Sequence, residues 1–206
     1  MTQLGFDLGP DPIPEYEAAF KTVQDFQKTL GKWMGPQKGV SSLFAHPIET
    51  PLGTMVSVCD ADRLHLLEFA DRKELPKELK RLGASSGTIS LGQTKVTRSL
   101  LDQLKRYFEG TLERFDLSLA LHGTDFTKSV WNALIELPFG TTTSYGALSE
   151  QLGNPGAVRA VARANGANQI AILIPCHRVI GADGTLTGYA GGLWRKRALL
   201  DLESKS

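Results

Sequence analysis

The feature that constrains this chain most is a short apolar run that ends at a proline and a cysteine. Residues 171–174 are too few and too apolar for a surface helix, and Pro175 restricts the residue before it to extended backbone. They predict a rigid buried segment whose end carries the thiol of Cys176. Residues 181–192 are rich in glycine, which predicts an adaptable loop beside that thiol. Buried support, reactive atom and loop in this order indicate an active site.

The composition allows a sizeable core and excludes several classes of protein. The chain has 206 residues, of which 41% are hydrophobic, enough for one large or two modest domains. Its 23 basic and 22 acidic side chains leave a net charge of +1, so any contact with DNA must come from a local face. No secretion signal or membrane-length apolar run is visible, which predicts a cytoplasmic protein with reduced thiols.

The two cysteines, Cys59 and Cys176, lie far apart in different contexts. One disulfide between them is possible, but no CxxC pair or Cys/His cluster has the spacing of zinc ligands. We therefore expect no structural metal. Cys59 ends a predicted strand, and because cysteine is among the most buried residue types we expect it to be structural.

The first part of the chain predicts a sheet with helices. Residues 15–30 have helical periodicity with Gly31 as the predicted stop, and residues 55–59 and 64–69 predict an antiparallel hairpin or meander. Two amphipathic helices are expected over residues 74–82 and 96–108. Alternating apolar side chains in residues 111–121 predict a connector that can lie as a strand. A domain boundary is expected near His122.

The second part is mostly helical. Thr124 is a good N-cap for a helix that stops at Pro138, and residues 144–152 and 156–165 predict two short helices joined by a turn that contains glycine. This is a helix-turn-helix pattern. Arg159 and Arg163 lie four residues apart on one face of an alanine-rich helix, which suits close approach to phosphates. An ordinary helix with solvated arginines is an equal alternative on these residues alone.

A reactive cysteine needs its thiolate, which a neighbouring base favours. His177 is the obvious base, but neighbours on an extended chain point to opposite faces, so direct contact requires a kink and a bridging water is the alternative. A carboxylate on the far ring nitrogen would complete the relay, and Glu203, in a predicted helix over residues 193–203, is one candidate among several. A cysteine hydrolase is disfavoured because no oxyanion-hole motif is recognisable.

Residues 168–179, which read NQIAILIPCHRV, resemble the active-site signature of the O6-alkylguanine-DNA alkyltransferases. The resemblance covers residues 123–203 strongly and residues 47–121 more loosely. Companion motifs fall at the family's spacing: Phe139-Gly140, Ser144-Tyr145, Gly153-Asn154-Pro155, Arg159-Ala160-Val161, Gly188-Tyr189, and Leu199-Leu200 with Glu203.

The resemblance implies an α+β protein in three parts. Residues 1–40 would be an N-terminal extension with one helix, and residues 41–121 a ribonuclease-H-like antiparallel sheet with helices. Residues 122–206 would form a mostly α domain that carries the helix-turn-helix and the cysteine.

The resemblance also implies a DNA repair reaction. After base flipping, the Cys176 thiolate would take the alkyl group from O6-alkylguanine, and from O4-alkylthymine, by in-line displacement. The thioether is stable, so each molecule would act once, as a suicide methyltransferase without cofactor or metal. The partner would be double-stranded DNA, bound through the minor groove by a monomer with no membrane contact and no obligate protein partner.

Individual roles follow from the same resemblance. His177, reached through water and oriented by Glu203, would form the proton relay, and Tyr145 would donate to N3 of the guanine. Arg159 and Asn168 are expected at the DNA: Arg159 would fill the stack left by the flipped base, and Asn168 would tie the recognition helix to the active-site segment. The remaining expected site residues are Arg163 and Arg178 at the DNA and Val179, Tyr189 and Ala190 in the pocket, with Ala190 where some relatives have serine.

Two alternatives stay open. A lesion-binding module of the alkyltransferase-like kind would recognise damage without repairing it, but such proteins lack the cysteine. The terminal part of an alkylation-responsive transcription regulator is the other, because residues 20–36 loosely resemble the end of a regulatory DNA-binding module. The cysteines needed to sense methyl phosphotriesters are missing from this chain.

Overall fold

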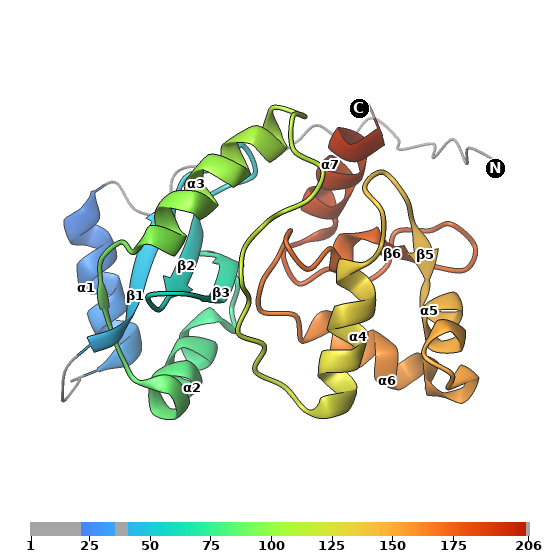
Figure 1. Cartoon of the computed structure of the whole chain (residues 1–206), viewed down its shortest axis with the longest axis horizontal. Helices are drawn as coiled ribbons and strands as arrows, with labels where there is room; N and C mark the ends of the chain where they lie inside the picture. Colours follow the sequence, from blue (N-terminus) through green and yellow to red (C-terminus); the bar gives the residue numbers. More distant parts are fainter. Residues whose placement is uncertain (1–21, 36–40, 205–206) are drawn as a thin grey trace.

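A computed structural model describes residues 22–35 and 41–204, and Figure 1 shows a sheet with helices beside a mostly helical half. The first half contains α1 (Val23–Met34), β1 (Ser41–Ile48), β2 (Met55–Cys59), β3 (Leu64–Phe69), α2 (Leu75–Ser86), β4 (Thr88–Leu91) and α3 (Lys95–Phe108). The second contains α4 (Asp125–Ile135), β5 (Thr143–Ser144), α5 (Tyr145–Gln151), η1 (Pro155–Ala157), α6 (Val158–Gly166), η2 (Cys176–Arg178), β6 (Val179–Ile180) and α7 (Leu193–Ser204). The prediction of an α+β protein is confirmed.

The four-stranded sheet has the order β3-β2-β1-β4. β2 and β3 form the predicted antiparallel hairpin, with Met55 opposite Phe69 and Val58 opposite Leu66, and β1 pairs antiparallel with β2. The prediction of a wholly antiparallel sheet is wrong at β4, which pairs parallel with β1. The reason is the connection: α2 carries the chain from β3 across to the far edge, and such helical crossovers are how parallel neighbours are reached.

Successive side chains of a strand point to opposite sides, and both faces of this sheet are covered. Val56, Val58 and Leu66 share one core cluster with Phe26 of α1 and Leu79 of α2.

The opposite face belongs to a second core cluster. Here Met55, Leu64 and Leu67 share a cluster with Leu100 of α3 and with Ile174, two residues before Cys176. One core therefore runs from the sheet into the second half of the chain. The predicted boundary near His122 stays a prediction.

The first described helix differs from its predicted bounds. α1 is capped by Thr22, whose side-chain oxygen accepts from the amide of Asp25, and it continues through Gly31 to Met34. The prediction that it ends at Gly31 is wrong, because the left-handed cap with φ of 67° is at Gly35. The predicted start at residue 15 lies outside the described residues.

Two later segments of the chain run along the outer edge of β3. The connector over residues 111–121 is not a strand but makes one parallel bridge, Leu64 to Leu119. Further along, Leu67 donates its amide to the carbonyl of Gln169 at 2.8 Å and accepts from the amide of Ala171 at 2.8 Å. The segment that leads to Cys176 is thereby held against the sheet. In residues 22–35 and 41–204, no helix is long and apolar enough to cross a membrane.

Gly140 and Gly153 form a matched pair that tests how tightly the end of α7 is packed. Both have φ of 69°, but a Cβ at Gly140 would lie 2.8 Å from the carbonyl oxygen of Glu203, whereas a Cβ at Gly153 meets nothing within 4 Å. We expect Gly140→Ala to lower the free energy of unfolding by about 1–3 kcal/mol more than Gly153→Ala, because only the former adds a backbone clash. Chemical denaturation measures both, and equal losses would contradict the packing described.

Candidate active site

The approach to the cysteine is a tight buried turn. The amide of Ile174 donates to the carbonyl of Ile170 at 3.0 Å, the amide of Cys176 donates to Ile174 at 2.7 Å, and Ile172 has φ of 72°. The predicted burial is confirmed, and the segment is a turn. A positive φ is unusual for a β-branched residue, so the surrounding packing must hold this turn in place.

The chain turns at the thiol, as direct contact between Cys176 and His177 would require. Cys176, His177 and Arg178 form the 3-10 turn η2, and all three side chains are buried. His177 Nε2 lies 2.8 Å from Glu203 Oε1. In the described part of the chain, Nδ1 of the same ring is buried and has no hydrogen-bond partner. The imidazole thus has one nitrogen fixed and one free for another group.

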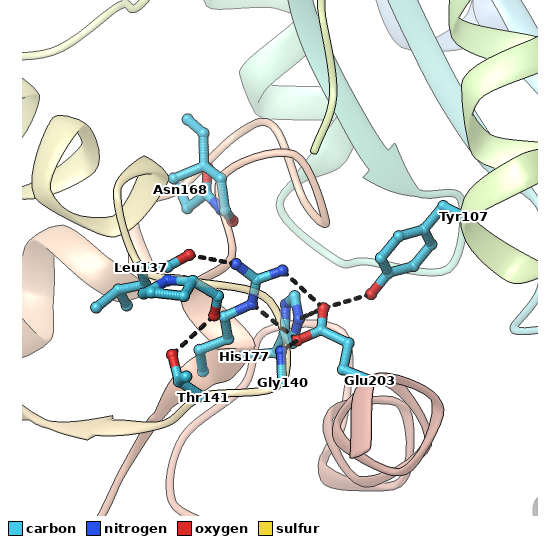
Figure 2. A network of polar contacts seen from close by, with 10 residues as sticks. Tyr107, Leu137, Gly140, Thr141, Asn168, His177 and Glu203 are labelled. Atoms are coloured by element: carbon cyan, nitrogen blue, oxygen red, sulfur yellow. Dashed lines mark hydrogen bonds and ion pairs between the residues drawn. The ribbon is translucent and has the colours of Figure 1, made fainter. Parts of the chain in front are cut away.

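Glu203 is the centre of the polar network in Figure 2. Its carboxylate accepts from Tyr107 Oη at 2.7 Å, from Arg178 Nε at 2.8 Å and from Arg178 Nη2 at 2.9 Å, besides its contact with His177. The amide of Gly140 completes the set at 3.4 Å. Sequence spacing left the acid of the relay open, and the structure brings Glu203 to this position from the last turn of α7.

The charges of this network define its protonation. Burial by itself raises the pKa of Glu203, but the hydrogen bonds and charges of His177 and Arg178 outweigh it and lower the pKa to about 2. Burial lowers the pKa of His177 even though Glu203 opposes the change. At neutral pH the pair is therefore a carboxylate and a neutral imidazole. With Nε2–H donating to Glu203, Nδ1 is left as the basic nitrogen.

The Cys176 thiol lies in a small cavity. Its side chain is buried, with 7% of the residue exposed, and Asn168 Nδ2 donates to Sγ at 3.1 Å. Burial raises the pKa of the thiol to about 11, and the Asn168 hydrogen bond opposes that rise. The cavity is lined by Glu68, Asn165, Gly166, Asn168, Ala171, Cys176, Gly188, Tyr189, Ala190 and Gly191. The cavity has a volume of about 10 Å³, which is at the limit for one water molecule.

Asn168 joins the end of α6 to the active-site turn. Its side-chain amide also donates to the carbonyl of Ile174 at 2.9 Å, and its Oδ1 accepts from the amide of Ile170 at 2.9 Å. This geometry fits the tie between helix and active-site segment that the resemblance implied. With 3% of the residue exposed, Asn168 is too buried here to contact DNA itself, so that part of its predicted role is corrected.

The prediction that Arg178 contacts DNA is wrong for this structure. Only 6% of the residue is exposed, and its guanidinium holds Glu203 and donates from Nη1 to the carbonyl of Leu137 at 2.6 Å. The guanidinium also lies 5.7 Å from the centroid of the Phe139 ring. An arginine with its donors engaged inside the core neutralises a buried carboxylate and has no surface to offer a phosphate.

The other predicted residues fall into two places. Arg159 and Arg163 are exposed on α6, and Tyr145 begins α5 half-buried, with a pKa raised by burial. Tyr189 and Ala190 line the cavity as predicted, whereas Val179 is not one of its lining residues. The carbonyl of Val179 accepts from Lys196 Nζ at 2.5 Å, so this residue helps to anchor the glycine-rich loop and does not face a ligand.

Three residues that sequence reasoning missed belong to the site. Tyr107 comes from α3, where it occupies an apolar stripe and its hydroxyl gives no signal of a polar partner. Lys196 holds the carbonyls of Val179 and Thr187, and burial lowers its pKa to about 8. Glu68 lies on β3, where an acidic side chain between apolar ones looks like a solvent-facing position, yet only 3% of it is exposed.

Within the same described ranges, no group of three or more His, Cys, Asp or Glu side chains is placed to hold a metal ion. Both cysteines are free thiols, and Cys59 is fully buried with a pKa raised to about 11 by burial. Cys59 therefore has the structural setting expected of it.

Comparisons with known proteins agree with this geometry. Residues 125–205 match the family model described as 6-O-methylguanine DNA methyltransferase, DNA binding domain. A methylated-DNA–protein-cysteine methyltransferase of Methanosarcina barkeri is 46% identical over 159 residues, covering 77% of this chain and 96% of the relative. The protein of that name from Mycobacterium tuberculosis is 61% identical over 103 residues, which cover 50% of this chain and only 62% of the relative's length.

Solved structures show the same relationship. The crystal structure of Mycobacterium tuberculosis OGT in complex with DNA has a TM-score of 0.69 and 43% identity, covering 79% of this chain and 93% of that one. The O6-methylguanine-DNA methyltransferase of Pyrococcus kodakaraensis has a TM-score of 0.59 and 28% identity, with 78% and 98% covered. The chain belongs to the methylated-DNA–protein-cysteine methyltransferase family.

The ionised state of Glu203 predicts a pH effect on stability. Its pKa falls from 4.5 to about 2 on folding, so its contribution is present above 4.5 and is lost as pH falls towards 2. Glu203→Gln removes this titration. We expect the variant to be less stable at neutral pH, because Arg178 loses its partner, and the difference in free energy of unfolding to shrink as the pH falls through that window. A difference that stays constant in denaturant titrations would contradict an ionised Glu203.

Proposed function

We propose that this chain repairs alkylated DNA by transferring the alkyl group from O6 of guanine to Cys176, once per molecule. The single observation that carries the proposal is the buried thiol in a small cavity, one residue from an imidazole whose Nδ1 is buried and unpartnered among the described residues. Family membership supports the reaction type. The same site would accept O4-alkylthymine, whose reacting carbon is also bonded to an exocyclic oxygen.

The first step is loss of the thiol proton. With Nε2–H donating to Glu203, Nδ1 of His177 is the acceptor, directly or through one water molecule. Glu203 then stabilises the imidazolium, while Arg178 compensates the negative charge of the carboxylate. Burial opposes formation of the thiolate, so the Asn168 hydrogen bond to Sγ has to favour it.

The second step is displacement at the alkyl carbon. The sulfur–carbon bond forms as the carbon–O6 bond breaks, and the electron pair stays on the guanine. Tyr145 donates a proton towards N3, which makes the guanine a better leaving group. The proton lost by Cys176 then replaces the one that Tyr145 gave. The product is a thioether on Cys176 and an unmodified guanine, so no cofactor takes part in the balance.

The cavity must open before a base can enter, because it is only large enough for about one water molecule. Gly188, Tyr189, Ala190 and Gly191 form one wall of it, and Tyr189 Oη is buried without a hydrogen-bond partner in the described residues. We infer that this wall moves when a flipped base arrives. A hydroxyl that gains a partner only then would help to hold the base.

DNA would be met by α5 and α6, acting as a helix-turn-helix. Exposure of Arg159 and Arg163 on α6 supports this, as does the bond from Trp131 Nε1 to the carbonyl of Ala164 at 2.8 Å, which seats α6 on α4. Small side chains suit α6 to the narrow minor groove, whose degenerate pattern fits a protein that scans any sequence. The sheet order supports the ribonuclease-H-like assignment of the first half. One chain supplies the whole site, which supports a monomer.

Cys176→Ser tests the nucleophile. We expect the wild-type chain, incubated with DNA that contains O6-methylguanine, to gain one methyl group on the Cys176 peptide in mass mapping, and the variant to gain none. Binding of the same DNA should persist, because the change removes only the reactive atom. Cys59→Ala is the matched control and should still transfer; a methyl group on Cys59, or transfer by Cys176→Ser, would refute the mechanism.

Arg159→Ala tests base flipping. We expect transfer from duplex DNA to slow by roughly tenfold or more, since refilling the stack offsets an unstacking cost of a few kcal/mol. Transfer from single-stranded DNA should change much less, because the base needs no extrusion there. Arg81→Ala, at an exposed arginine of α2, is the control. Equal slowing on both substrates would show that Arg159 serves general phosphate binding instead.

A further inference from the structure

A buried arginine of the sheet half reaches the active site. Arg72 lies three residues after the end of β3 and has only 7% of its surface exposed. Nη1 donates to the carboxylate of Glu68, and Nη2 lies 3.2 Å from Glu78 Oε1 on α2. The same Nη1 donates to the main-chain carbonyl of Asn168 at 3.1 Å. One guanidinium therefore links the sheet and α2 to the residue that contacts the thiol.

The main chain of Asn168 controls where its side chain lies. The carbonyl is held by Arg72, while the amide group Nδ2 donates to Cys176 Sγ at 3.1 Å. A hydrogen bond weakens steeply when its distance and angle change, so a small rotation at Asn168 would cost the thiolate its donor. Arg72 lies one residue step from the sulfur in this chain of contacts, without touching it.

Glu68 adds a second connection. It lines the cavity of Cys176, so one partner of the ion pair with Arg72 forms part of the cavity's wall. Burial raises the pKa of Glu68, and the charge of Arg72 opposes that rise. The titratable and charged groups that act on the thiol come from β3, the turn after it, α5, α7 and the glycine-rich loop: Glu68, Arg72, Tyr145, Tyr189 and Lys196. Without Arg72, burial would favour the neutral form of Glu68, and the ion pair beside the sulfur would be lost.

We propose that Arg72 is a positioning residue for the alkyl acceptor: held by Glu68 and Glu78, it fixes the Asn168 main chain so that the Asn168 amide points at Sγ. This rests on the proposed function, in which Cys176 is the nucleophile. In this arrangement the sheet half contributes to the reaction and does not only support the second half. Removing Arg72 alone would leave Glu68 buried and unpaired, which destabilises a fold strongly, so the test must neutralise both partners.

The experiment is a double-mutant cycle between the ion pair and Asn168. Four chains are compared: wild type, Glu68→Gln/Arg72→Met, Asn168→Ala, and the triple variant. The readout is the rate at which iodoacetamide modifies Cys176, by peptide mass, across the pH range in which thermal unfolding shows each chain folded. This reagent needs no DNA, so the result stands even if methyl transfer fails. Methyl transfer from damaged DNA is measured in parallel.

We expect the Glu68→Gln/Arg72→Met chain to react about tenfold more slowly at a given pH below the thiol's titration, the scale of one hydrogen bond to a charged acceptor. Asn168→Ala should slow the reaction at least as much, and the triple variant no further than Asn168→Ala alone. Asp102→Asn/Arg106→Met on α3 neutralises an exposed ion pair with the same charges and should leave the rate unchanged.

Two outcomes would overturn the proposal. A wild-type rate and pH profile in Glu68→Gln/Arg72→Met would show that the pair only stabilises the fold. Fully additive effects in the triple variant would show that the pair acts on the thiol without Asn168. If iodoacetamide follows the expected pattern while no chain transfers methyl groups, the positioning holds and the proposed function fails.

Discussion

The arrangement of the second half depends on one buried carboxylate. Glu203 would be costly to place in the core alone, because an unpaired charge loses its hydration there. Arg178 offsets the charge, and His177 and Tyr107 also bond to the carboxylate, so α7, η2 and α3 meet around this group. The interaction that holds three elements together also sets the tautomer of the imidazole. Stability and chemistry in this protein therefore share the same few hydrogen bonds.

Sequence reasoning predicted what local patterns determine. The β2–β3 hairpin, the Thr124 cap and the short helices on either side of Gly153 all follow from periodicity and turn chemistry over a few residues. The helix stop predicted at Gly31 was wrong because a glycine inside a helix costs little free energy when a cap follows in the next turn. β4 was missed because four residues with one buried side chain carry too little pattern.

The site was predictable where residues are close in sequence and not where the fold brings them together. Cys176 and His177 are neighbours, so their joint role could be read directly. Arg178 was misplaced because an arginine beside an active site suggests a phosphate, and only tertiary contacts show that a buried carboxylate takes it. Glu68 and Tyr107 reach the site through packing between the two halves, for which one chain's sequence holds no local signal.

The contacts along the outer edge of β3 have a consequence for solubility. A sheet's edge strand exposes unpaired amides and carbonyls to which a second chain can add, and this is a common route to aggregation. Here the chain covers that edge itself: Leu64 bonds with the connector through Ser118 and Ala120, and Leu67 bonds with Gln169 and Ala171. The turn that precedes Cys176 thus also helps to shield this edge of the sheet from a second copy of the chain.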